Sequence, residues 1–320
     1  MEINWSQVES KIGIKFKHSD YLRLALTHPS YAEQLGKPEE NNERLEFLGK
    51  SMLNLACIDY LYRNCPYLEA GKLSKLRDKL VEGERLTKLW FQMELGASYP
   101  FLALKEERYQ LRQKSNNPFA SAFKALVGAI YLDRGYLQTR KWIDKHLIAP
   151  LLERYQKDIK ERFSHNKQLQ LLGNALLKAI VAEYLYNLLP GMKEKGLSSL
   201  AKNLLKKEKV NEYNSQLTKQ DLAVLKLGDE IVPTKPFKPL LGAIYVDYHT
   251  ENDKTAFAKT SKWLANKFLD EEKTLQRGIS LLLKDGYPKK WIIHNILGYE
   301  SKNYQAGKDK YNEIMTTTTS

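Results

Sequence analysis

The residues whose types and spacing suggest chemistry lie in residues 42–53, which read NERLEFLGKSML. Glu43 and Glu46 are three positions apart, and Lys50 follows four positions after Glu46. Residues at these separations share one face of an α-helix, so the three charged side chains would project together. Carboxylates are ligands that magnesium prefers, whereas an ammonium group pairs readily with phosphate. The stretch therefore predicts a helix with one charged face, suited to a metal ion or to a phosphate.

Three stretches of the chain resemble motifs of the ribonuclease III family, in the family's order. Residues 43–51 resemble its signature helix, E-R-L-E-F-L-G-D-S, at eight of nine positions. The exception is Lys50, where the family has a metal-binding aspartate. Residues 26–31 (LTHPSY) resemble a motif that precedes this helix, and residues 119–133 (FASAFKALVGAIYLD) resemble the closing motif. The resemblance covers about residues 8–150 and implies a ribonuclease III-like helical domain there.

The family's metal site can be carried over onto this chain by motif. Its four acids fall at Glu46, Lys50, Ser121 and Lys124, and Lys72 stands where the family has the glutamate of an E-L-S-K motif. Magnesium needs hard oxygen ligands, usually carboxylates and water. A lysine removes a ligand and adds a cation, and two unit charges ~4 Å apart at an effective dielectric of ~20 repel by ~4 kcal/mol. We therefore expect no catalytic magnesium and no other cofactor.

A second copy of the motifs follows the first. Residues 167–177 (KQLQLLGNALL) align with residues 43–53 at a separation of 124 positions, and residues 236–247 (PFKPLLGAIYVD) repeat the closing motif. Such self-similarity indicates a repeated structural unit. The positions equivalent to the metal site are Gln170, Asn174, Lys235 and Lys238. None of these side chains is a carboxylate, so no metal is expected in the second copy either.

The spacing of apolar residues predicts the fold class. Leucine, isoleucine and aromatic residues recur at helical spacing almost throughout, and alternating strand-like runs are nearly absent. We predict an all-α protein with a degenerate ribonuclease III-like domain at 1–155 and a second, shorter one at 160–270. The two would pair within the chain as a pseudo-dimer. Residues 271–320 predict either a small helix-turn-helix-like unit or a helical tail that packs on the main body, and residues 105–118 a polar loop.

The composition indicates an acidic partner. The chain has 320 residues, a net charge of +13 and a pI near 9.3, which favours nucleic acid first and an anionic membrane second. No apolar run approaches the ~20 residues of a membrane span. The first residues lack the pattern of a signal peptide. Cys57 and Cys65 do not have the spacing of metal ligands and predict two buried thiols. We expect a cytoplasmic protein.

These features favour a protein that binds structured or double-stranded RNA without cleaving it. It would act in RNA processing, in rRNA or ribosome assembly, or on an active ribonuclease III. One alternative is an active endoribonuclease with non-standard metal ligands, and another is a protein-interaction scaffold with no RNA role. Lysines at former acid positions would hold phosphate, or they would simply be solvated. The RNA-binding candidates are Lys50, Lys72, Lys124, Lys235 and Lys238.

Overall fold

The structure, a computed structural model, describes residues 4–95, 118–152, 165–223, 225 and 233–316. Within these ranges the chain forms helices and no strand, so the predicted all-α class is confirmed. The predicted polar loop lies outside the described residues except for its last position. The short connection expected between the two copies also lies outside them, except at its end.

The first copy is built around two long helices that cross at very close range. Gly49 and Gly128 make this possible: a Cβ atom on Gly49 would lie 1.8 Å from the carbonyl oxygen of Lys124, and one on Gly128 would lie 2.3 Å from that of Leu45. No side chain fits at either point. The helices of this copy are α1 (Trp5–Ile12), α2 (Ser19–Ala25), α3 (Pro29–Gln34), α4 (Glu43–Asn64), α5 (Ala70–Leu80), α6 (Gly83–Gln92), α8 (Pro118–Ile143), the π-helix η1 (Asp144–Ile148) and α9 (Ala149–Leu152).

The second copy repeats this crossing. A Cβ atom on Gly173 would lie 1.8 Å from the carbonyl oxygen of Lys238, and one on Gly242 would lie 2.5 Å from that of Leu169. The two glycines are those that the sequence repeat aligns with the glycines of the first crossing. The helices of this copy are α10 (His165–Leu188), α11 (Glu194–Leu205), α12 (Lys207–Ser215), α13 (Lys219–Ala223), α14 (Phe237–Glu251) and α15 (Ala256–Phe268).

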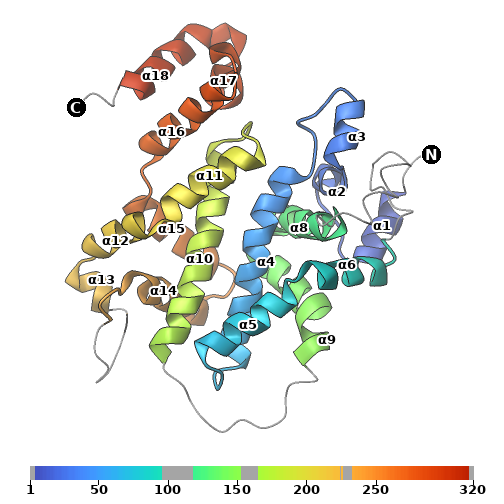
Figure 1. The fold of residues 1–320 in the computed structure, drawn as a ribbon, viewed down its shortest axis with the longest axis vertical. Coiled ribbons are helices and arrows are strands. Elements are labelled where there is room, and N and C mark those ends of the chain that lie inside the picture. The colour runs from blue at the N-terminus through green and yellow to red at the C-terminus, as the bar shows by residue number, and fades with distance from the viewer. Residues whose placement is uncertain (1–3, 96–117, 153–164, 224, 226–232, 317–320) are drawn as a thin grey trace.

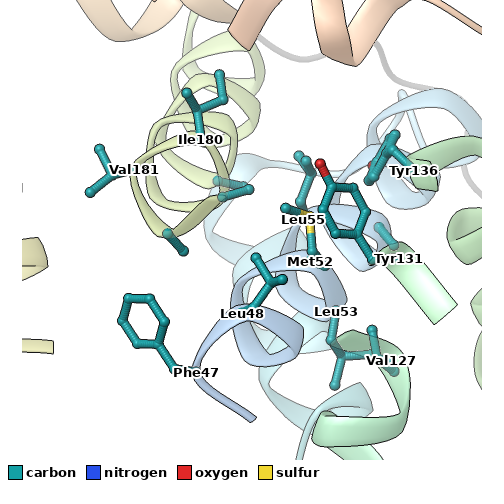
Figure 2. Close-up of a cluster of buried hydrophobic side chains, with 14 of the residues drawn as sticks. Phe47, Leu48, Met52, Leu53, Leu55, Val127, Tyr131, Tyr136, Ile180 and Val181 are labelled. Carbon is teal, nitrogen blue, oxygen red and sulfur yellow. The ribbon is translucent and has the colours of Figure 1, made fainter. Parts of the chain in front are cut away.

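The signature helices of the two copies, α4 and α10, pack against each other at the centre of the molecule (Figure 1). Figure 2 shows Leu48 and Met52 of α4 between α8 and the apolar side chains Ile180 and Val181 of α10. These residues belong to one continuous cluster of buried side chains that includes both copies and the tail. Burial of apolar surface of this extent is the main force that holds the pair together. Cys57 and Cys65 are free thiols and are buried, as predicted.

The copies also exchange hydrogen bonds in a reciprocal way. Tyr245 of α14 donates to Asp59 of α4 at 3.0 Å, and Tyr131 of α8 donates to Glu183 of α10. The sequence repeat aligns Asp59 with Glu183 and Tyr131 with Tyr245. Each signature helix thus presents a carboxylate to a tyrosine on the closing helix of the other copy. Exchange of equivalent contacts is the mark of an isologous, two-fold interface, here formed within one chain.

A second reciprocal pair of contacts caps the ends of the signature helices. Arg44 of α4 donates to the carbonyl oxygens of Leu189, at 2.8 Å, and Met192, just beyond the end of α10. Gln168 of α10 donates to the carbonyl oxygen of Pro66 at 2.9 Å and to a second one nearby, just beyond the end of α4. Arg44 also donates to the carbonyl oxygen of Tyr186 in the last turn of α10, at 2.9 Å, where helical carbonyls have no partner within the helix.

The tail consists of α16 (Glu271–Lys284), α17 (Lys289–Asn295), the short 3-10 helix η2 (Ser301–Asn303) and α18 (Tyr304–Thr316), which stack at one end of the molecule (Figure 1). Gly278 of α16 lies against the side chain of Leu189, and Gly191 lies against the ring of Trp291. The tail therefore packs on the second copy through α16 and α17. No helix in the described ranges is long and apolar enough to cross a membrane.

Candidate functional site

The metal-site positions of the first copy line a groove of about 620 Å³, which we call the site groove. One wall comes from α4 and α8 of the first copy, and the opposite wall comes from α10 and α11 of the second. Glu46 and Lys50 reach it from α4, and Ser121 and Lys124 reach it from the start of α8. The close crossing of α4 and α8 brings these residues together although they are about 75 positions apart in sequence.

Glu46 is the one carboxylate among these four positions, and its side chain is engaged. Its Oε1 atom accepts a hydrogen bond from the Ser121 hydroxyl at 2.9 Å and from the Lys124 ammonium at 3.1 Å. The Glu46 and Lys124 side chains are 26% and 22% exposed, so the ion pair is partly shielded from water. Lys124 therefore supplies a positive charge beside the carboxylate to which a metal would bind.

The other two lysine candidates of the first copy lie farther out. Lys50 is exposed at the edge of the site groove. Lys72 is exposed on α5 and is not among the residues that line this groove. Sequence position alone grouped Lys72 with the site, because its motif is adjacent to the family's active-site motif. The structure does not bring its side chain into the groove.

The second copy holds its four equivalent positions in a different state. Gln170 and Lys235 are exposed, and Asn174 and Lys238 are half-buried. Within the described ranges, none of the four side chains makes a hydrogen bond or an ion pair. Burial lowers the pKa of Lys238, and the nearby charge of Lys178 lowers it further. The second site is therefore a set of uncharged amides and unpaired cations, with no carboxylate to neutralise them.

Two further lysines of the site groove were missed by motif reasoning. Lys178 of α10 and Lys202 of α11 belong to the second copy but line the groove of the first. Burial lowers the pKa of Lys178, and the positive charges of Arg77 and Lys50 add to this effect. A sequence signal for Lys178 does exist, since it lies eight positions after Gln170 and so on the same helical face. No comparable signal points to Lys202, because only packing brings α11 to the first copy.

The site groove also contains carboxylates outside the motif positions. Glu43 and Glu194 line it together with Glu46. Burial raises the pKa of Glu43, and the negative charge of Glu194 raises it further, so the two acids are close enough to repel each other. Across the described part of the chain, no group of three or more histidine, cysteine or acidic side chains is placed to hold a metal ion. This donor set does not fit a magnesium cage.

Asp133, the acid at the end of the first closing motif, has a structural role. Its carboxylate accepts hydrogen bonds from the backbone amides of Lys17, at 2.8 and 3.0 Å, and His18, at 2.8 Å. These amides lie directly before α2, where helical donors have no partner in the helix. Asp133 is not one of the four positions onto which the family's metal site was carried over, and its buried contacts explain its presence without a catalytic task.

Comparison with known proteins identifies the family. Residues 19–151 match the family described as Ribonuclease-III-like. A ribonuclease 3 from Borreliella afzelii is 41% identical over 138 residues, which are 43% of this chain and 56% of that protein. A ribonuclease 3 from Ectopseudomonas mendocina is 39% identical over 166 residues, which are 51% of this chain and 69% of that protein. The chain belongs to the ribonuclease III family. The prediction made from the three motifs is thus confirmed.

A second match extends beyond the first copy of this ribonuclease III-family chain. Residues 133–236 match the family described as Large ribosomal subunit protein mL44, endonuclease domain. This range contains α10 and α11, which form one wall of the site groove. Among solved structures, the nuclease domain of ribonuclease III from Campylobacter jejuni is 31% identical, with a TM-score of 0.40, over 45% of this chain and 98% of that one. The chain spans 56% of the length of the Borreliella relative.

Proposed function

We propose that this ribonuclease III-family protein binds structured or double-stranded RNA in the site groove and does not cleave it. The observation that carries the proposal is the ion pair between Lys124 and Glu46, at 3.1 Å, in the place of the family's metal site. The Lys124 ammonium neutralises Glu46, the one carboxylate that remains among the four motif positions, so the carboxylate is balanced without a bound metal ion. A groove with that acid neutralised repels RNA phosphate less than a groove of bare carboxylates would.

The lysines of the groove supply the attraction. Lys50 and Lys178 have no hydrogen-bond or ion-pair partner among the described residues, and Lys202 adds a third ammonium. Ammonium groups bind phosphate as point charges, and each such contact releases counterions from the nucleic acid. The net charge of +13 adds a long-range attraction to a polyanion. Charge of this kind gives affinity for the RNA backbone and little information about its sequence.

Magnesium has no part in this mechanism. Hydrolysis in the family uses bound magnesium to activate water and to stabilise charge on phosphate oxygens. The first copy offers one motif carboxylate, already held by Ser121 and Lys124, and the second copy offers none. We expect the purified protein to leave double-stranded RNA intact in magnesium or manganese.

The match of residues 133–236 to the mL44 endonuclease domain suggests the process in which this RNA binding takes part. We infer a role in RNA processing, in rRNA or ribosome assembly, or beside an active ribonuclease III, and we expect the protein in the cytoplasm. The intramolecular pairing of α4 with α10 leaves neither signature helix available for a second chain. The protein should therefore be a monomer of about 37 kDa in light scattering. A dimer that persists on dilution would contradict this.

An electrophoretic mobility shift with long double-stranded RNA, with and without magnesium, tests the proposed function. Binding without cleavage supports it. Metal-dependent cleavage that Glu46→Ala abolishes would favour an active endoribonuclease instead, and neither binding nor cleavage would favour a protein-interaction scaffold. The double variant Lys50→Glu/Lys124→Glu should weaken binding and flatten its dependence on salt, by about 0.9 in log–log slope for each lost contact on a DNA calibration. Lys72→Glu/Lys75→Glu, at two exposed lysines of α5 that do not line the groove, changes the net charge by the same amount and is the matched control.

A further inference from the structure

A second groove, larger than the first, lies between the second copy and the tail. Its volume is about 1050 Å³, and α11 forms one side and α16 the other, with a contribution from the end of α18. We call it the tail groove. Figure 1 shows α16 lying beside α11 at the end of the molecule where the tail stacks. Charged side chains of both signs line it: Lys206, Lys273, Arg277 and Lys284, with the acids Asp270 and Glu272.

Three of the four cations that line the tail groove have side chains without a hydrogen-bond or ion-pair partner among the described residues. Arg277 and Lys284 of α16 are exposed, Lys206 at the end of α11 is exposed, and none of the three makes a hydrogen bond or ion pair within the described ranges. The nearby acids are differently placed. Asp270, at the start of α16, pairs with Lys273 at 3.1 Å. The charged groups in the middle of the groove are therefore positive and available to an anion.

Two further acids near the tail groove, Glu272 and Glu212, each lie close to a cation outside the set Lys206, Arg277 and Lys284. The negative charge of Glu272 contributes to raising the pKa of Lys310, after the larger effect of the hydrogen bond from Lys310 to Glu313. Glu212 is ion-paired with Lys209 on α12. The hydrogen bond from Lys209 is the main cause of the lowered pKa of Glu212, and the positive charges of Arg277 and Lys206 add to it, so this acid offsets part of their charge. The four cations that line the tail groove still outnumber its two acids, Asp270 and Glu272. A surplus of positive charge of this kind is stabilised when a polyanion binds.

The tail groove adjoins the site groove, since α11 separates them and lines both. Lys202 of α11 lines the site groove, and Lys206, one helical turn later, lines the tail groove. Lys206 directly follows the last residue of α11, so its backbone lies about one helical turn beyond Lys202. A phosphate backbone that leaves the site groove over the end of α11 therefore passes from one lysine to the next and enters a second cationic channel.

We propose that the tail groove binds the sugar–phosphate backbone of the same RNA that occupies the site groove, so that the tail extends the RNA-binding surface beyond the two ribonuclease III-like copies. This inference rests on the proposed function. Arginine and lysine supply the charge, and the hydroxyl of Ser280 can donate to a phosphate oxygen. Leu200, Leu281 and Met315 add apolar surface to the groove, and the cations beside them supply the attraction for an anion. The chemistry favours an extended polyanion over a protein segment.

The test uses the full chain and the double variant Arg277→Glu/Lys284→Glu. We expect RNA affinity to fall by about tenfold or more, and the log–log salt slope to decrease by about 2 for two lost phosphate contacts. The control is Lys290→Glu/Lys302→Glu, which changes the charge of the tail by the same amount at exposed positions that do not line the groove. An equal loss in both variants would overturn the proposal, because it would reflect net charge alone.

Ultraviolet cross-linking of the bound RNA, followed by peptide mass spectrometry, gives a second readout that does not depend on a variant. We expect cross-linked peptides from residues 273–284, and their absence alongside cross-links in α4 or α10 would overturn the proposal. If anionic vesicles bound the wild type but not the Arg277→Glu/Lys284→Glu variant, while RNA bound both equally, the groove would belong to a membrane surface instead. Failure of wild-type protein to bind RNA at all would contradict the proposed function, whereas these outcomes concern the tail groove alone.

Discussion

The interface between the two copies and the site groove differ in what their carboxylates do. At the interface both copies have an acid at the same position of the signature helix, Asp59 and Glu183, and each accepts a hydrogen bond from a tyrosine of the other copy. In the site groove, one of four motif positions in the first copy is a carboxylate, and the second copy has none. The same long helices thus carry acids that hold the copies together and lack the acids that would hold metal.

The difference follows from burial. The Asp59 side chain is 1% exposed and accepts hydrogen bonds from Tyr245 and Arg63, and it is also an ion-pair partner of Arg140. Removing it would leave several buried donors without hydrogen-bond partners. This lowers the stability of the folded protein, because water does not reach these donors to replace the lost bonds. Glu46 is about a quarter exposed, so water can reach the groups that it now holds. Folding therefore demands the Asp59 carboxylate but sets no comparable demand on Glu46.

The largest effect is expected at Asp59. Asp59→Ala removes the common partner of Arg63, Arg140 and Tyr245, and should lower the free energy of unfolding by about 3–5 kcal/mol, as found when one member of a buried ion pair is lost. Urea unfolding followed by circular dichroism measures this change. The control is Glu46→Ala on the same helix, which should cost less than about 1 kcal/mol because Lys124, its partner, can be solvated when the carboxylate is removed. Similar losses in both variants would abolish the distinction between interface and site.

A smaller effect is expected at Asp144, the first residue of the π-helix η1, whose Oδ1 atom is buried without a hydrogen-bond partner in the described structure. Burial raises its pKa to about 7, and Asp59 and Asp253 add to the effect while Arg63 and Arg140 oppose it. The folded protein therefore binds this proton more tightly than the unfolded chain. Stability should fall as the pH rises from about 4 to about 7.

Asp144→Asn should remove this cost. The free energy of unfolding at pH 8 should rise, by at most about 4 kcal/mol for a shift of about three pKa units, and its decline between pH 5 and pH 8 should flatten. Urea unfolding at the two pH values measures both changes. Asp285→Asn, at an exposed carboxylate, is the control and should leave the pH dependence unchanged. An unaltered pH profile in Asp144→Asn would contradict the assignment of the proton to this group.

Rebuilding the family's acids in the first copy would make the site resemble a metal cage. In the triple variant Lys50→Asp/Ser121→Asp/Lys124→Glu, three new carboxylates would join Glu46 in the site groove. Their repulsion should lower the melting temperature. Bound magnesium should raise it again, because a ligand at about ten times its Kd adds about 1.4 kcal/mol to the free energy of unfolding. Lys50→Asp alone should show no such response, because two carboxylates do not form the cage. A magnesium response of equal size in the wild type would show that the missing acids are not the deciding feature.

The smallest effect is expected from a change that removes charge but keeps shape. Glu46→Gln should lower the free energy of unfolding by less than about 1 kcal/mol, because its partner Lys124 can be solvated. It should also strengthen RNA binding slightly, since one negative charge leaves the groove. Fluorescence anisotropy with labelled RNA measures the second effect. A marked loss of affinity would mean that the carboxylate itself contacts RNA.

Much of the architecture could be read from the sequence. The repeat of the signature helix 124 positions later predicted a second ribonuclease III-like domain, and it places Gly173 where the first copy has Gly49. Gly49 and Gly173 both proved to be points where a Cβ atom would strike the backbone of the closing helix. Helical periodicity is a local property, so it is visible in a single sequence. The absence of acids at Lys50, Ser121 and Lys124 was equally visible.

Other features depended on the tertiary structure. The sequence placed Lys72 with the site, but the packing of α5 leaves this side chain outside the groove. The sequence also gave no reason to place Lys202 inside the groove. The bonds from Ser121 and Lys124 to Glu46, and the exchange of Tyr131 and Tyr245 between copies, join residues far apart in the chain. Such contacts depend on how helices cross, and a crossing is set by the fit of two complete surfaces. The sequence by itself therefore determined the helices and the lost acids, and only the packing decided which side chains meet.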